Sequence, residues 1–111
     1  MDFVNLPKNT NHLTNNESIQ SMDPLIGQIA IFPWNWAPKN WAKCDGQLLS
    51  ISQNSALFAL IGTEFGGDGK NSFALPKMPP IKTENVDESG NDRGGDLAYY
   101  IALQGYFPPR G

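Results

Sequence analysis

The sequence offers very little thiol or imidazole chemistry. Its 111 residues include one cysteine, Cys44, and one histidine, His12. A single cysteine excludes an internal disulfide framework, so packing alone has to hold the fold together. One cysteine and one histidine also leave too few ligands for a zinc site within one chain. Because His12 lies in a polar segment that cannot easily hold it as a base, we expect Cys44 to be a small buried packing residue rather than a nucleophile.

Long apolar runs and basic patches are also missing. No stretch approaches the ~20 apolar residues that a helix needs to cross a bilayer. The first residues lack the basic and apolar regions of a secretory signal peptide. A net charge of −3 gives no basic footprint for a phosphate backbone. We therefore expect no membrane insertion, no export by the secretory route and no nucleic-acid partner.

Glycine and proline, by contrast, are plentiful. The chain has 11 glycines and 9 prolines, and hydrophobic residues make up 40% of it. This composition predicts one small, loop-rich domain with many turns and a modest core. Residues 1–23 are polar, with apolar residues scattered singly, and are expected to form a flexible arm. Residues 24–111 then make up the folded domain.

The first half of that domain shows strand and turn signals. Residues 25–32 predict a strand with Ile29 and Ile31 on one face and Ala30 and Phe32 on the other. Residues 32–41 contain two prolines, which forbid regular structure and indicate a fixed loop. The pair Asp45 and Gly46 suits a type I′ turn, so a hairpin is expected between residues 41–44 and 47–49.

The second half contains one helix and a closing strand. Ser52 is expected to cap a helix of about residues 52–61, and Gly62 to end it. Residues 81–96 are polar and rich in glycine, which predicts a mobile surface loop. Residues 97–104 predict a closing strand. Leu97, Tyr99, Ile101 and Leu103 are expected on one face, and Ala98, Tyr100, Ala102 and Gln104 on the other. The expected fold class is α+β, mainly β, with short strands, hairpins and one short helix.

Two groups of residues invite a catalytic or metal-binding reading. The loop at residues 66–70 resembles a phosphate-binding loop, but Glu64 and Asn71 stand where a Walker motif requires glycine and serine or threonine. A single glycine-rich copy favours a structural turn over a metal site. The acidic side chains of residues 87–96 could pair for glycoside cleavage, yet on a polar loop they lack the burial that raises a pKa, so solvated charge is the expectation.

The aromatic residues are more informative. Three tryptophans fall between positions 34 and 41. Trp34 and Trp36 are two residues apart beside prolines, so in an extended loop they point the same way. They either join the core or form an exposed ledge for a partner or a sugar ring. Tyr106 and Phe107 are two further rings that a small domain leaves near its surface.

Several motifs, taken together and in order, resemble the phage tail collar domain family in its short, stand-alone form. They are Ile26-Gly27-Gln28-Ile29, Cys44-Asp45-Gly46-Gln47-Leu48-Leu49, Ala56-Leu57-Phe58-Ala59-Leu60-Ile61-Gly62, Phe65-Gly66-Gly67-Asp68-Gly69 and Phe73-Ala74-Leu75-Pro76. The structural residues of the motif are Trp41, Cys44, Asp45, Gly46, Gly66, Gly67, Asp68 and Gly69. The sequence departs from the family pattern at Lys77-Met78-Pro79-Pro80 and lacks the long glycine-rich insert of larger members.

The resemblance implies a non-enzymatic module, without a cofactor, at the distal end of a phage-tail-like fibre, injection apparatus or filament. Its role is then assembly or the binding of a glycan or protein receptor, on a virion tail or an extracellular tail-like structure. The implied partners are other fibre, tail or filament proteins and further copies of the chain, three in tail fibres. The residues expected at the contact are Trp34, Trp36, Tyr106 and Phe107. The alternative is a free-standing carbohydrate-binding module that uses Trp34 and Trp36.

Overall fold

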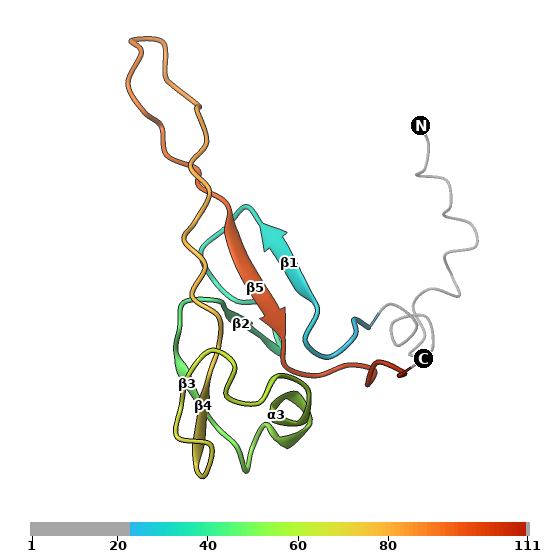
Figure 1. Cartoon of the computed structure of the whole chain (residues 1–111). Helices are drawn as coiled ribbons and strands as arrows, with labels where there is room; N and C mark the ends of the chain where they lie inside the picture. Colours follow the sequence, from blue (N-terminus) through green and yellow to red (C-terminus); the bar gives the residue numbers. More distant parts are fainter. Residues whose placement is uncertain (1–22, 111) are drawn as a thin grey trace, which may run out of the picture.

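The computed structural model describes residues 23–110, so the arm expected at residues 1–23 lies outside them but for Asp23, which is exposed. The described chain contains short strands and one short helix (Figure 1). They are β1 (Ile29–Phe32), β2 (Trp41–Lys43), β3 (Leu48–Ser50), α3 (Ser55–Ile61), β4 (Ser72–Ala74) and β5 (Ala98–Ala102). The fold class is α+β, mainly β, which confirms the sequence-based prediction.

The strands form two small antiparallel sheets. One has the order β1-β5-β2, and the other pairs β3 with β4. β5 comes last in the chain but occupies the centre of its sheet, as Figure 1 shows. Ile101 lies opposite Ile29 of β1 on one side and opposite Ala42 of β2 on the other. The two ends of the folded domain are therefore held side by side.

The hairpin predicted around Asp45 and Gly46 is wrong. β2 and β3 do not pair with each other; each belongs to a different sheet. Between them the chain pairs with residues 75–78, because the Gly46 N–H donates to the Pro76 carbonyl at 3.2 Å and the Met78 N–H donates to the Cys44 carbonyl at 2.9 Å. Asp45 and Gly46 therefore connect the two sheets. The backbone of residues 75–78 takes the hydrogen bonds that a local β2–β3 hairpin would have used.

The helix begins later than the sequence suggested. Its N-cap is Asn54, whose side chain makes no capping hydrogen bond and instead donates to the Ser50 carbonyl at 3.0 Å. The Ser52 hydroxyl lies 3.0 Å from the Ser50 hydroxyl, so the capping role assigned to Ser52 is wrong. The predicted end at Gly62 is confirmed: its N–H donates to the Phe58 carbonyl at 2.8 Å.

The hydrophobic core lies between the two sheets and the helix. Leu57 is completely buried, and the ring of Phe58 packs against that of Phe73 with centroids 5.4 Å apart. The buried cluster consists of Ala42, Cys44, Leu57, Phe73, Leu75 and Ile101. Every element except β1 contributes to it or packs directly on it. A core of this size is consistent with a chain of 111 residues that has no disulfide.

The alternation of faces predicted for the strands is confirmed. Burial does not follow it as one buried face and one exposed face. Ile101 faces the core and Tyr100 the opposite side, yet both are fully buried. The aromatic loop covers the second face of β5. On the edge strand β1, Ile29 and Ile31 share the face of Ile101 but remain exposed, because the core extends mainly towards β2.

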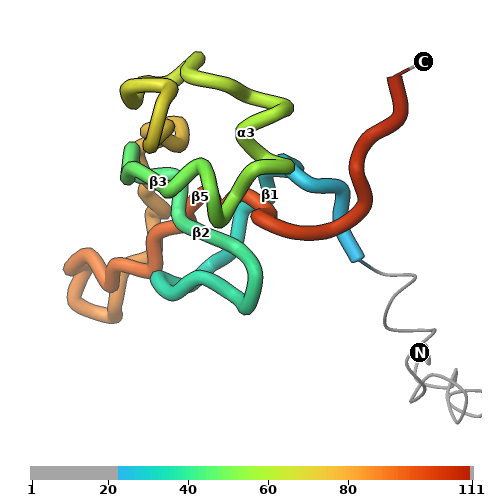
Figure 2. The backbone as a smooth tube through the Cα atoms, turned by 90° about the horizontal axis from the view of Figure 1, so that it is seen from below, coloured from blue at the N-terminus to red at the C-terminus, as the bar shows by residue number. Residues whose placement is uncertain are grey.

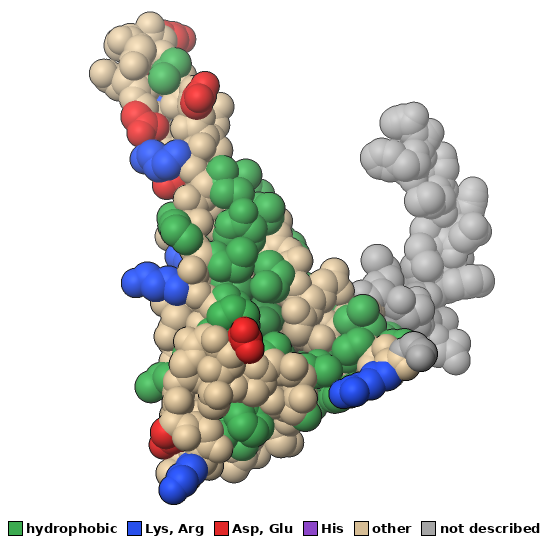
Figure 3. Space-filling model, in the orientation of Figure 1, with side chains coloured by type: hydrophobic (Ala, Val, Ile, Leu, Met, Phe, Trp, Pro, Cys, Tyr) green, Lys and Arg blue, Asp and Glu red, His purple; other side chains and the backbone are tan. Residues whose placement is uncertain are grey.

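Residues 81–97 form a narrow arm that projects from the sheet (Figure 1). At its base, Ile81 and Leu97 exchange two backbone hydrogen bonds of 2.8 and 2.9 Å. Charged side chains gather along it in Figure 3. Lys82 and Asp92 both belong to this arm, and their charged atoms lie 3.6 Å apart. The arm confirms the predicted surface position of this segment.

Gly67 lies at a point of the fold that has no room for a side chain. Its φ is +96°, and a Cβ atom there would overlap the Cα of Phe73, which is backbone and cannot move aside cheaply. We expect Gly67→Ala to cost at least about 3 kcal/mol, because a close clash in the core adds to the ~1–2 kcal/mol of a left-handed non-glycine residue. Gly90→Ala is the matched control: its φ is +87° but nothing lies within 4 Å. Thermal or urea unfolding of both variants measures the difference, and equal losses would contradict the prediction.

Candidate binding surfaces

The aromatic loop between β1 and β2 forms a column of stacked rings. Phe32 and Trp34 stack with centroids 5.0 Å apart and an interplanar angle of 5°. Trp34 and Trp36 stack at 5.0 Å and 12°. This geometry confirms the expectation that Trp34 and Trp36 point the same way. We call the three rings the aromatic column.

The half-buried Trp41 and the buried Tyr100 fix the column to the sheet. Trp41 meets the ring of Phe32 edge-on at 5.5 Å, and Tyr100 lies at 5.6 Å from it. The Tyr100 hydroxyl donates a hydrogen bond of 2.6 Å to the Trp34 carbonyl. Burial raises the pKa of Tyr100, so this donor keeps its proton at neutral pH. The loop is therefore held from β5, which supports both its backbone and its first ring.

The column becomes more exposed away from the sheet. Trp34 is 36% exposed and Trp36 is 59% exposed. Trp34 has a ring stacked on each of its two faces, so it presents mainly its edge to a ligand. Trp36 is stacked on one face only. The column ends in one accessible indole face, that of Trp36.

The C-terminal tail carries the two other rings predicted to form a contact. Tyr106 is 53% exposed and Phe107 is 50% exposed. Tyr106 is attached to the segment before β1, because its N–H donates to the Pro24 carbonyl at 2.9 Å and its carbonyl accepts from the Ile26 N–H at 2.8 Å. Figure 2 shows the tail passing beside this segment. The sequence therefore predicted the exposure of these rings but not that they belong to a separate surface from the column.

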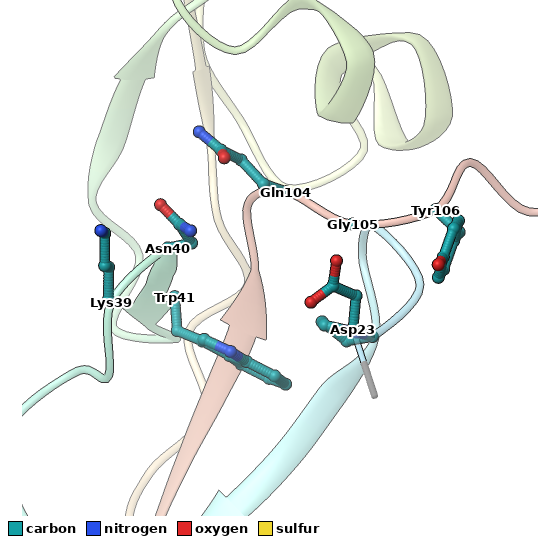
Figure 4. A pocket seen from close by; sticks show the side chains of 8 residues that line it. Asp23, Lys39, Asn40, Trp41, Gln104, Gly105 and Tyr106 are labelled. Carbon is teal, nitrogen blue, oxygen red and sulfur yellow. The ribbon is translucent and has the colours of Figure 1, made fainter. Parts of the chain in front are cut away.

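A hollow of about 300 Å³ lies where the tail, the start of the domain and the end of the aromatic loop meet. Figure 4 places Lys39 and Asn40 on one side and Asp23 and Tyr106 on the other, with Gln104 and Gly105 on the segment after β5. The Trp41 side chain also lines it. The polar residues of this hollow were not predicted from the sequence, because they come from three segments that no motif links.

The turn at residues 66–72 is organised by one carboxylate. Asp68 Oδ1 accepts backbone hydrogen bonds of 2.9, 2.8 and 2.9 Å from Lys70, Asn71 and Ser72. These N–H groups, that of Asn71 foremost, lower the pKa of Asp68 to about 2. A carboxylate that accepts its own turn's N–H groups acts as a structural cap.

Cys44 is buried at the centre of the core, with 1% of its surface exposed. Burial, and to a lesser degree the charge of Asp45, raise the pKa of the Cys44 thiol to about 11. A neutral buried thiol is a poor nucleophile. His12 lies outside the described residues, so its relation to Cys44 remains a prediction.

Two acidic residues of the arm, Asp87 and Asp92, hydrogen-bond to their own turns. Asp87 accepts backbone hydrogen bonds from Ser89 and Asn91, and Asp92 accepts one from Gly94. These bonds lower the pKa of both carboxyls. Between residues 23 and 110, no group of three or more histidine, cysteine, aspartate or glutamate side chains is arranged to hold a metal ion.

One known protein family matches part of the chain. Residues 27–79 match the model of the Phage Tail Collar Domain. Over these residues, just under half of its length, the chain is similar to this family. No curated protein and no solved structure gives a significant match. The collar domain is a structural module of phage tail fibres, which points to the virion tail and to association with other tail proteins.

The collar match includes all eight structural residues proposed from the sequence. Cys44, Asp68 and helix α3 lie inside it, as does the aromatic column. β5, the arm and the tail lie beyond residue 79. In the part of the chain that the structure describes, no helix has the length and apolar character needed to cross a membrane.

One residue inside the collar match could have pointed to the hollow. Asn40 has φ +69° and is the only non-glycine residue with positive φ among residues 23–110. Asparagine tolerates this conformation better than most residues. The asparagine directly before Trp41 is therefore a weak sequence signal of a backbone position with positive φ.

The carboxylate of Asp68 generates a pH-dependent prediction. Its pKa is lowered from 3.8 to about 2, so its contribution to stability is present above pH ~4 and is lost as the pH falls towards 2. We expect Asp68→Ala to melt several degrees lower at pH 7, and the difference from wild type to shrink below pH 4. Asp68→Asn keeps the acceptor oxygen without the charge, so it should retain part of the stability. Melting curves from pH 2 to 7 test this; a constant difference would contradict it.

The buried thiol generates a second prediction. Because the pKa of Cys44 is about 11, we expect a thiol reagent at pH 7.5 to label the native chain far more slowly than the chain in guanidinium. Cys44→Ala should leave any partner binding unchanged, since packing is the role of the thiol. Rapid labelling of the native chain, or lost binding by a folded Cys44→Ala, would show that the thiol is functional.

Proposed function

We propose that this chain is a non-enzymatic structural and attachment module at the distal end of a phage-tail-like fibre, injection apparatus or filament. The aromatic column, which is exposed and yet fixed in place, carries this proposal. A flexible loop would not hold three rings in a stack, and a loop with only a packing role would not leave Trp36 more than half exposed. The collar match supports the tail assembly as the setting.

The column suits a protein partner. Rings that are already ordered lose little conformational freedom when they are covered, so more of their burial energy appears as affinity. Tryptophan and tyrosine are also the residues that most often dominate the energy of an interface. Burying Trp36 contributes the largest apolar side chain that the loop offers. Trp36 is therefore the proposed anchor, with Trp34 behind it.

The tail is the second proposed contact. Tyr106 and Phe107 are about half exposed. Two rings in water next to proline-fixed backbone favour association with another chain at low entropic cost. We propose that further copies of the chain cover these surfaces, three around an axis as the family resemblance implies, together with neighbouring tail proteins.

A free-standing carbohydrate-binding module built on Trp34 and Trp36 is less well supported. Sugar rings stack on aromatic faces, and the faces of Trp34 are covered by Phe32 and Trp36. The column therefore offers one platform instead of two. A protein surface, which can enclose the edge of Trp34 and the face of Trp36 together, fits the column better.

Light scattering tests the self-association. We expect the full-length chain at micromolar concentration to form an oligomer. Trp36→Ala and a version truncated after Gly105 should each shift the mass towards the monomer, because each removes a proposed contact. Leu48→Ala is the control, since Leu48 is 62% exposed but lies on β3, away from both contacts. Monomers throughout would overturn self-association and leave a monomeric tip docked on another protein.

A further inference from the structure

Four polar side chains that have no partner among residues 23–110 line the hollow shown in Figure 4. They are Asp23, Lys39, Asn40 and Gln104. Within residues 23–110, none of these side chains takes part in a hydrogen bond or an ion pair, although elsewhere the side chains of Asp68, Asp87 and Gln47 are hydrogen-bonded to their own turns. Polar groups gathered around a concave surface and left unpaired by the fold are available to a ligand.

The backbone that shapes the hollow tolerates little variation. At Gly105 a Cβ atom would overlap the Pro24 carbonyl, so only glycine lets the tail approach the start of the domain. On the opposite side, Asn40 has φ +69°, and its carbonyl accepts a hydrogen bond of 2.8 Å from the Leu103 N–H. Both walls are therefore tied to the residues that follow β5. The hollow is formed by the fold itself rather than left between loosely packed segments.

The charges and hydrogen-bonding groups define a class of ligand. Asp23 and Lys39 contribute one negative and one positive charge, so the hollow has no excess charge to attract a phosphate or a sulfate. Asn40 and Gln104 each offer both a donor and an acceptor. A hydroxyl group is likewise a donor and an acceptor, so a ring that carries several hydroxyls matches the hydrogen-bonding groups of these side chains. A purely apolar ligand would leave them unsatisfied.

The remaining walls and the size agree with such a ring. The aromatic side chains of Trp41 and Tyr106 also line the hollow, and they provide apolar surface for the C–H groups of a sugar. About 300 Å³ is at the lower end of the range for ligand pockets, ~300–1,000 Å³. This space fits one sugar unit better than an extended oligosaccharide or a nucleotide.

We infer that this hollow binds one neutral sugar unit of a surface glycan. The inference rests on the proposed attachment function and names its ligand class. It places the glycan beside the tail and not on the aromatic column. Asn40 and Gln104 are the main hydrogen-bonding residues, Asp23 and Lys39 hold further hydroxyls, and Trp41 and Tyr106 contact the ring.

Saturation-transfer difference NMR on the full-length chain tests the site. The probes are glucose, galactose, mannose, N-acetylglucosamine and rhamnose, each with the protein in separate samples. We expect at least one to bind with a Kd on the order of 1 mM, which is typical for so small a ligand. Gln104→Leu keeps the size of the side chain and removes its amide. Asn40→Gly keeps the positive φ and removes the side chain. Each should weaken binding about tenfold or more.

Leu48→Ala is the matched control, because Leu48 is exposed on β3 and does not line the hollow. It should bind the same sugar as the wild type does, and the melting temperature of each variant shows that it is folded. Trp36→Ala tests whether the sugar binds the column instead. Three results would overturn the inference. Binding could survive in both hollow variants, it could be lost only in Trp36→Ala, or no sugar in the panel could bind. Oligomerisation measured by light scattering on the same samples is independent, so the proposed assembly role can stand or fall separately.

Discussion

The structure depends above all on the insertion of β5 between β1 and β2. These two strands lie within the region that matches the collar family, yet they have no direct pairing with each other. β5, which lies outside that region, supplies the hydrogen bonds that join them. Because Ile101 fills the core on one face and Tyr100 supports the aromatic loop on the other, the same strand stabilises both layers.

Both surfaces proposed to bind partners are positioned from this central strand. The aromatic column is anchored by the ring and the hydroxyl of Tyr100, in the middle of β5. The hollow is completed by Gln104 to Tyr106, the residues that continue the chain beyond it. A change that shifts β5 is therefore expected to disturb the column and the hollow together, even where it touches neither. The two surfaces remain separable by substitutions at their own residues, Trp36 on the column and Gln104 in the hollow.

The sequence revealed the elements better than their partners. Local signals were enough for the faces of β1 and for the end of the helix at Gly62, because both are set by neighbouring residues. The hairpin at Asp45 and Gly46 was wrong since its turn signal competes with a distant segment, residues 75–78, which no local pattern reveals. The common direction of Trp34 and Trp36 followed from their spacing. The hollow did not, because its walls come from segments that the fold alone brings together.

The pairing of Ile29 with Ile101 has a consequence for synthesis and folding. Contacts between residues so far apart in the chain require the closure of a long loop before any stabilisation is gained, which slows folding compared with a helical bundle of the same size. On the ribosome, β3, α3 and β4 can meet while the C-terminal part is still being made, but the three-stranded sheet has to wait for β5. Until then β1 and β2 expose unpaired edges, which are the surfaces most prone to pair with another nascent chain.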